Sequence, residues 1–138
     1  MRITLLGAGH IGQTITRLLH GSGDYRVTVV DRSAAALAKI VADPACAGVA
    51  TRVAETADAA GVGAVLRGQD AVVNALPYHL ATVAATAARE AGVHYFDLTE
   101  DVAATRAIKA LAEGARTAFM PQCGSRTTWP AASTRCTR

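Results

Sequence analysis

Residues 3–12 read Ile-Thr-Leu-Leu-Gly-Ala-Gly-His-Ile-Gly, and this stretch decides the fold. A short apolar run leads directly into the pattern G-x-G-x-x-G, formed by Gly7, Gly9 and Gly12. A helical pattern follows, and a second apolar run ends at Asp31. A strand before the glycines, a helix after them and an acid about 20 residues later are the context of a dinucleotide-binding motif.

The three glycines are expected to have separate roles. Gly7 lets the chain leave the first strand in a tight turn, Gly9 lets a pyrophosphate approach bare backbone, and Gly12 lets the helix pack close to the strand. The first helix opens with its free N–H groups and positive dipole end toward the phosphates. The alternative is that the glycines only form a turn. The predicted cofactor-binding loop comprises Gly7, Ala8, Gly9, His10, Ile11 and Gly12.

The end of the second strand bears on the choice between NAD and NADP. The Asp31 carboxylate can accept hydrogen bonds from both ribose hydroxyls, and its charge opposes a 2′-phosphate, which favours NAD. Arg32 acts in the other direction, because an arginine at this place can bind a 2′-phosphate. We therefore expect NAD as the cofactor, with NADP as the alternative.

Length and charge limit the function classes. A chain of 138 residues fits one domain. The net charge of +3 comes from Arg126, Arg135 and Arg138, because the remaining residues carry equal numbers of acidic and basic side chains. The body of the chain therefore lacks the charge expected of a nucleic-acid-binding protein.

Hydropathy and cysteines bear on the compartment. The sequence contains no apolar run long enough to span a membrane, and it begins with a strand pattern rather than a signal peptide. Cys46, Cys123 and Cys136 are odd in number and far apart, which fits neither a disulfide framework nor a zinc site. We expect a cytoplasmic protein that acts on a small molecule without a membrane partner. The sequence leaves homodimerisation open.

Strand and helix patterns alternate along the chain. Strands are predicted at 3–6, 25–30, 48–53, 71–76, 93–98 and 116–120, and helices at 10–20, 33–41, 59–67, 77–92 and 99–113. Pro77 is expected in the first turn of the fourth helix, and Thr99 is expected to cap the fifth. Regular alternation indicates an α/β fold, a doubly wound parallel six-stranded Rossmann sheet with strand order 3-2-1-4-5-6.

Several polar residues follow the later strands, at the sheet edge where ligands bind in such folds. Asn74, Ala75, Leu76 and Pro77 follow the fourth strand and are predicted to line the cofactor site. His79 begins the next helix, where it could transfer a proton or simply line the cleft. Asp97 could orient a substrate amine or act as an acid/base group, or it could be a turn acid. Cys123 follows the sixth strand as a candidate catalytic thiol or an inert buried cysteine.

Three segments together resemble the saccharopine dehydrogenase and lysine 6-dehydrogenase family. They are Asn74-Ala-Leu-Pro-Tyr-His79, Ala91-Gly-Val-His-Tyr-Phe-Asp-Leu-Thr-Glu100 and Met120-Pro-Gln-Cys-Gly124. The resemblance implies hydride transfer between NAD(P) and a carbon–nitrogen bond of an amino-acid substrate, through an imine. It also implies that a following α+β domain supplies most substrate contacts.

The resemblance covers residues 1–124 and stops there. Residues 125–138 have no apolar period, and we expect them to be a disordered tail. The abrupt change suggests a truncated or frame-shifted product that lacks the substrate domain and is inactive alone. Two other hypotheses remain: a nucleotide-sensing regulatory Rossmann module of the potassium-uptake type, and an inactive fragment. The first of them does not account for the Leu-Pro-Tyr-His and Tyr-Phe-Asp-Leu-Thr-Glu segments.

Overall fold

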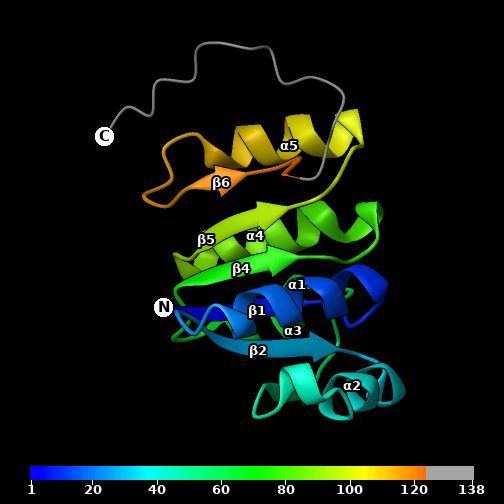
Figure 1. Cartoon of the computed structure of the whole chain (residues 1–138). Coiled ribbons are helices and arrows are strands. Elements are labelled where there is room, and N and C mark those ends of the chain that lie inside the picture. Colours follow the sequence, from blue (N-terminus) through cyan, green and yellow to red (C-terminus); the bar gives the residue numbers. More distant parts are fainter. Residues whose placement is uncertain (124–138) are drawn as a thin grey trace, which may run out of the picture.

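Six parallel strands form one sheet in the order β3-β2-β1-β4-β5-β6 (Figure 1). The structure is a computed structural model that describes residues 1–123. The strands are β1 (Arg2–Leu6), β2 (Arg26–Asp31), β3 (Ala50–Val53), β4 (Ala71–Asn74), β5 (His94–Asp97) and β6 (Phe119–Met120). The predicted fold class and strand order are confirmed. The predicted tail at 125–138 lies outside the described residues.

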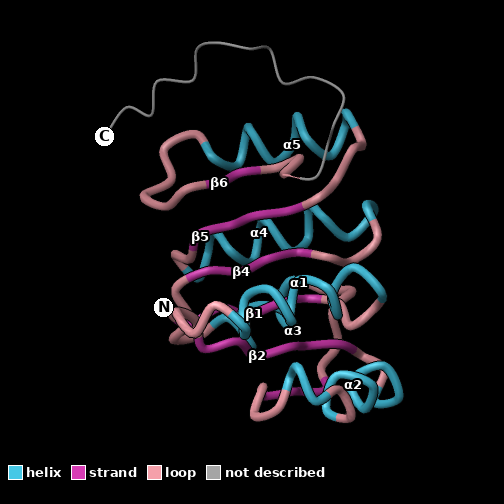
Figure 2. The backbone as a smooth tube through the Cα atoms, in the orientation of Figure 1, coloured by secondary structure: helices cyan, strands magenta, loops and turns pink. Residues whose placement is uncertain are grey.

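Five α-helices connect the strands, as the alternation of helix and strand in Figure 2 shows. They are α1 (His10–Gly21), α2 (Ala34–Val41), α3 (Ala59–Leu66), α4 (Ala81–Ala91) and α5 (Val102–Ala112). None of the helices within residues 1–123 has the length and apolar character needed to cross a membrane.

The helices cover the two faces of the sheet with separate cores. Leu5 in β1 packs with Ile15 of α1 and Leu37 of α2 on one face. The next residue of the strand, Leu6, belongs to the other core, which includes α3, α4 and α5. Successive side chains of a strand point to opposite faces, so one short apolar strand contributes to both cores. This two-sided burial explains why the strands read as continuous apolar runs.

Several predicted boundaries are wrong in detail. The third strand starts at Ala50 rather than residue 48, because Gly48 turns the chain with φ 87°. A 3₁₀ turn at Tyr78–Leu80 precedes α4, and Pro77 lies before that turn rather than in the helix.

The fifth helix also begins later than predicted. The side chain of Asp101 caps it by accepting a hydrogen bond from the Ala104 amide at 2.7 Å. Thr99 is therefore not the cap. Its amide instead donates to Asp97 Oδ1 at 3.0 Å, which holds the segment in a turn before the helix starts.

Candidate functional site

The carboxyl ends of the strands gather at one edge of the sheet, toward which the arrows in Figure 1 point. Parallel register places Leu6 beside Val30 on one side and beside Asn74 on the other. Asn74 in turn pairs with Asp97 of β5. The turn after β1, the end of β2 and the loops after β4 and β5 therefore meet at this edge, as the sequence predicted.

The turn between β1 and α1 depends on the absence of side chains at two of its glycines. Gly7 has φ 102°, and a Cβ there would lie 2.8 Å from the Ala75 carbonyl oxygen. A Cβ at Gly12 would lie only 2.0 Å from the Gly7 carbonyl oxygen, so α1 packs directly against the turn. Gly9 differs from both, because a Cβ there would meet no atom within 4 Å. Its bare backbone faces open space.

The amino end of α1 has unused hydrogen-bond donors. Ser33, Asp58 and Asp101 cap α2, α3 and α5 with their side chains, whereas α1 begins after Gly9 without a side-chain cap. None of the hydrogen bonds found within residues 1–123 takes the amides of Gly9, His10 or Ile11 as donors. Free amides at the positive end of a helix dipole are suited to binding an anion.

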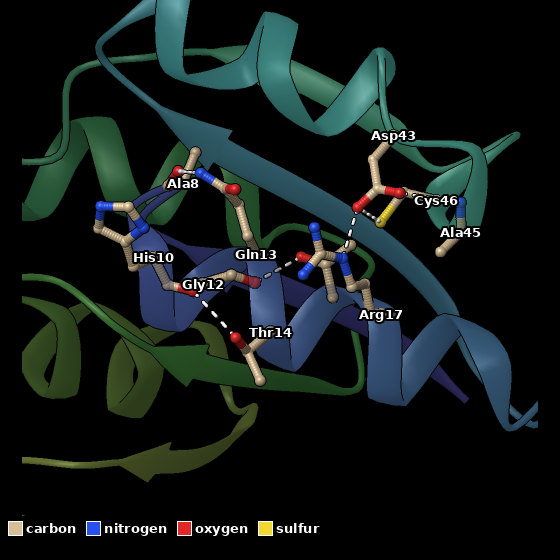
Figure 3. A network of polar contacts seen from close by, with 10 residues as sticks. Ala8, His10, Gly12, Gln13, Thr14, Arg17, Asp43, Ala45 and Cys46 are labelled. Atoms are coloured by element: carbon tan, nitrogen blue, oxygen red, sulfur yellow. Dashed lines mark hydrogen bonds and ion pairs between the residues drawn. The ribbon is translucent and has the colours of Figure 1, made fainter.

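Polar side chains of α1 leave those amides available (Figure 3). Gln13 Nε2 donates to the Ala8 carbonyl oxygen at 3.2 Å, and the Thr14 hydroxyl donates to the His10 carbonyl oxygen at 3.1 Å. Both contacts use carbonyl groups, one in the turn and one in the first residue of α1, and neither uses an amide. The N–H groups of residues 9–11 therefore have no acceptor within residues 1–123.

Asp31 connects this turn to the end of β2. Its Oδ2 accepts from the Ala8 amide at 2.8 Å, and its Oδ1 accepts from the Ser33 amide at 2.8 Å. A carboxylate has about four lone-pair sites, so two backbone bonds leave acceptor capacity for a ribose hydroxyl. Arg32 follows it as an exposed cation.

Two hollows lie at this edge of the sheet, on either side of Leu76 in the loop after β4. The first, here called the Asp31 hollow, has a volume of about 230 Å³. The second, here called the Thr99 hollow, has a volume of about 170 Å³. The Asp31 hollow is lined by Asp31, Arg32, Glu55, Thr56, Pro77 and His79, among others. The Thr99 hollow is lined by Ile11, Asn74, Ala75, Tyr78, Thr99 and Glu100, among others. Leu76 contributes to both, so the two hollows lie side by side.

A larger hollow of about 410 Å³ lies away from this edge. Arg2, His20 and Arg26 help to line it, at the start of β1, the end of α1 and the start of β2. Its lining lies at the amino ends of β1, β2 and β3, at the sheet edge opposite to the one where the glycine turn lies. Size alone therefore does not mark the site in this fold.

A buried hydrogen-bond network holds the loops around the Thr99 hollow. The fully buried Tyr95 hydroxyl accepts from Asn74 Nδ2 at 3.2 Å and donates to Asp97 Oδ2 at 2.7 Å. Asp97 Oδ1 accepts from the amides of Thr99 and Gln122, each at 3.0 Å. Burial, followed by the Asp97 carboxylate, raises the pKa of Tyr95 well above its usual value. Tyr95 therefore stays protonated and acts as a fixed donor.

The three candidate catalytic residues occupy different environments. Asp97 is 1% exposed and lines neither hollow, a geometry that favours the turn-acid interpretation. His79 lines the Asp31 hollow, with its ring centre 5.8 Å from that of Tyr78. Cys123 is an exposed residue, which contradicts the buried-cysteine alternative. Its thiol donates to the Met120 carbonyl oxygen at 3.1 Å, and partial burial raises its pKa. Cys123 also lines neither hollow.

Sequence reasoning gave no role to the loop after β3. Glu55 and Thr56 line the Asp31 hollow, and Glu55 Oε1 accepts from the amides of Thr56 and Ala57, each at 2.9 Å. These residues follow a strand that neighbours β2. The rule that ligands bind beyond the carboxyl ends of the strands was the signal that could have identified them.

These features define a Rossmann-type dinucleotide-binding domain: an uncapped helix behind a glycine turn, an acid at the end of β2, and two hollows beside them. Residues 3–120 match the family model described as the saccharopine dehydrogenase NADP binding domain. The chain belongs to this family, which confirms the predicted resemblance, and its cofactor is NAD(P). It is an oxidoreductase-type nucleotide-binding domain.

Solved structures share this fold across nearly the whole chain. Saccharopine dehydrogenase (L-Glu forming) from Saccharomyces cerevisiae matches 89% of the chain with a TM-score of 0.77 and 24% identity. The WlbA dehydrogenase from Chromobacterium violaceum, in complex with NADH and UDP-GlcNAcA, matches 88% with a TM-score of 0.67 and 20% identity. Biliverdin reductase from Synechocystis, in complex with biliverdin and NADP⁺, matches 87% with a TM-score of 0.68 and 21% identity.

The matched region is a minor part of each of these proteins. It spans 27% of the yeast enzyme, 34% of the WlbA dehydrogenase and 37% of biliverdin reductase. No match was found among proteins with curated functions. The comparisons therefore describe the nucleotide-binding part of larger enzymes.

Proposed function

We propose that this domain holds NAD(P) for hydride transfer to or from a carbon–nitrogen bond of an amino-acid substrate. The observation that carries the proposal is the set of unused amides at the start of α1, at the same sheet edge as two adjoining hollows. A dinucleotide has matching parts, since its diphosphate suits the amides and its two nucleosides suit the two hollows. Family membership supports the cofactor, and the yeast enzyme with the same fold motivates the substrate class.

Three groups of residues bind three parts of the cofactor. The amides of Gly9, His10 and Ile11 bind the diphosphate, for which the bare Gly9 leaves room. The Asp31 hollow takes the adenosine, with the Asp31 carboxylate accepting from the ribose hydroxyls. The Thr99 hollow takes the nicotinamide. When bound, the nicotinamide supplies the hydride-transfer chemistry, and the chain orients it and excludes water from one side.

The preference between the two cofactors follows from neighbouring opposite charges. Asp31 opposes a 2′-phosphate, while the exposed Arg32 at the same hollow attracts one. We therefore propose that both cofactors bind, with NAD bound more tightly.

Proton transfer needs a titratable group beside the nicotinamide. Among the described residues that line the Thr99 hollow, Tyr78 and Glu100 are titratable. Asp97, His79 and Cys123 do not line this hollow, so acid/base roles for these three residues remain hypotheses. For His79, which lines the Asp31 hollow, we propose a contact with the adenosine end of the cofactor. Most substrate contacts are assigned to a following α+β domain, as the family resemblance implies. Within residues 1–123, Cys46 and Cys123 are free thiols, which fits the proposed cytoplasmic location.

Titration with NADH, NADPH and ADP-ribose tests the proposal. The Asp31→Ala variant should lose about tenfold in NADH affinity and bind NADPH relatively better, because a charged acceptor at the ribose is removed. Asp24→Ala is the matched control, since Asp24 is an exposed acid on the loop between α1 and β2. Thermal unfolding of each variant checks that the fold persists.

The outcomes separate the alternatives. Failure of the unaltered chain to bind any of the three nucleotides would refute the proposal and leave an inactive fragment. If ADP-ribose binds as tightly as NADH, and a longer chain with a substrate domain turns over no amino acid, a nucleotide-sensing module is favoured instead.

A further inference from the structure

Thr99 combines two properties on the wall of the Thr99 hollow. The residue is 8% exposed, and its Oγ1 is enclosed without a hydrogen-bond partner among the residues described. Buried hydroxyl groups in folded proteins nearly always have a hydrogen-bond partner, so a buried hydroxyl without one beside a hollow calls for an explanation. Its backbone is meanwhile held in place by the bond from its amide to Asp97.

The other polar side chains around this hollow already make hydrogen bonds or are exposed. Asn74 is 2% exposed and uses both ends of its amide, since Nδ2 donates to Tyr95 and Oδ1 accepts from the Leu76 amide at 3.2 Å. Tyr78 is 63% exposed, and Glu100 is also exposed. Thr99 is therefore the buried, anchored residue at this wall whose side chain makes no hydrogen bond within residues 1–123.

We propose that the Thr99 hydroxyl hydrogen-bonds the carboxamide of the nicotinamide ring and so sets the orientation of the ring; the inference rests on the proposed function. A hydroxyl both donates and accepts, which suits a carboxamide with one carbonyl oxygen and one amino group. Threonine has staggered alternatives at χ1, and the inference requires the one that presents the hydroxyl to the hollow. The Asp97 contact keeps the backbone fixed while the side chain turns. Thr99 is thus a positioning residue.

Thr4 provides an internal comparison. Its Oγ1 is also buried without a partner among residues 1–123, and the residue is completely enclosed in the middle of β1. It does not contribute to the Thr99 hollow or the Asp31 hollow. An effect that comes merely from removing a buried orphan hydroxyl should therefore be the same at both threonines, and an effect on nicotinamide should appear only at Thr99.

The test compares Thr99→Val, Thr99→Ser and Thr4→Val by titration with NADH and with ADP-ribose, which lacks the nicotinamide. Valine keeps the shape of threonine and removes the hydroxyl. We expect Thr99→Val to weaken NADH binding about 3- to 10-fold, the range of one neutral hydrogen bond, and to leave ADP-ribose binding unchanged. Thr99→Ser should bind both ligands like the unaltered chain, and so should Thr4→Val.

Two results would overturn the inference while the proposed function stands. In one, Thr99→Val binds NADH as tightly as the unaltered chain. In the other, it loses affinity for NADH and ADP-ribose equally, which would make Thr99 a loop-supporting residue only. Absence of binding of either ligand by the unaltered chain would overturn the proposed function and this inference together.

Discussion

Adding one methyl group at Gly12 should destabilise the whole domain. The new Cβ would lie 2.0 Å from the Gly7 carbonyl oxygen, and ordinary contact requires about 1.4 Å more. Because both atoms belong to the backbone or are fixed to it, α1 must shift away from the turn. Overpacking of this kind costs about 1–3 kcal/mol, and the better helix propensity of alanine returns about 1 kcal/mol at most. The severe overlap places the expected net loss at about 2 kcal/mol.

The assay is thermal unfolding together with NADH titration. It compares alanine variants at three glycines whose surroundings differ: Gly12, Gly63 and Gly9. Gly12→Ala should lower the Tm by on the order of 10 °C. Gly63→Ala, in the middle of α3 with open space around the position, should be neutral or stabilising by about 0.5–1 kcal/mol. Gly9→Ala should unfold within about 0.5 kcal/mol of the unaltered chain, because its extended backbone and open surroundings accept a Cβ.

The same Gly9→Ala variant should lose at least about tenfold in NADH affinity, because its methyl group occupies the space where the diphosphate meets the backbone. The reasoning about packing is refuted if Gly12→Ala unfolds no earlier than Gly63→Ala. The reasoning about the diphosphate is refuted if Gly9→Ala binds NADH as tightly as the unaltered chain.

Three further outcomes are expected. Tyr95→Phe should cost about 1–3 kcal/mol in urea unfolding, since Asp97 loses a buried donor. Because the folded-state pKa of Tyr95 is raised, its contribution is complete below about pH 10 and falls as pH rises above that; the variant should lack this alkaline decline. The Arg17 side chain contacts Asp43 (Figure 3) and lowers its pKa. The stability that this contact contributes is therefore lost as pH falls below about 4. Asp43→Asn should flatten that acid decline, measured as Tm against pH at low salt. Burial raises the pKa of the Cys123 thiol, so peptide mapping should show slow alkylation at neutral pH that accelerates in alkali.

Much of the fold could be predicted from local sequence. Gly7 and Gly12 are backbone requirements, because a Cβ at Gly12 would overlap the Gly7 carbonyl oxygen and one at Gly7 would overlap the Ala75 carbonyl oxygen just after β4. The strand order follows from alternation and from the handedness of parallel crossovers. The second helix was predicted from residue 33, and Ser33 caps α2 with its hydroxyl, which accepts from the Ala36 amide at 3.2 Å. Such caps involve residues three positions apart and are readable from sequence.

The roles of Asp97 and Thr99 could not be predicted in the same way. Asp97 accepts from Gln122, 25 positions away, and its burial depends on packing between β5 and the segment after β6. A carboxylate before Thr-Glu-Asp looks the same in sequence whether it faces a ligand or a backbone amide. The choice of Asp101 over Thr99 as helix cap also follows from this contact, because Asp97 already holds the Thr99 amide.

The missing cap on α1 is the feature that connects stability to function. A side-chain cap contributes about 1 kcal/mol to a helix, and α2, α3 and α5 each have one from Ser or Asp. Packing of Gly12 against the turn requires the first residues of α1 to lie close to β1, which keeps the helix in place without such a cap. A Ser or Asp at position 9 would satisfy the amides from within the chain and would compete with a diphosphate for them. The fold therefore supplies by backbone packing the stability that a cap would otherwise provide, and the amides stay available for the cofactor.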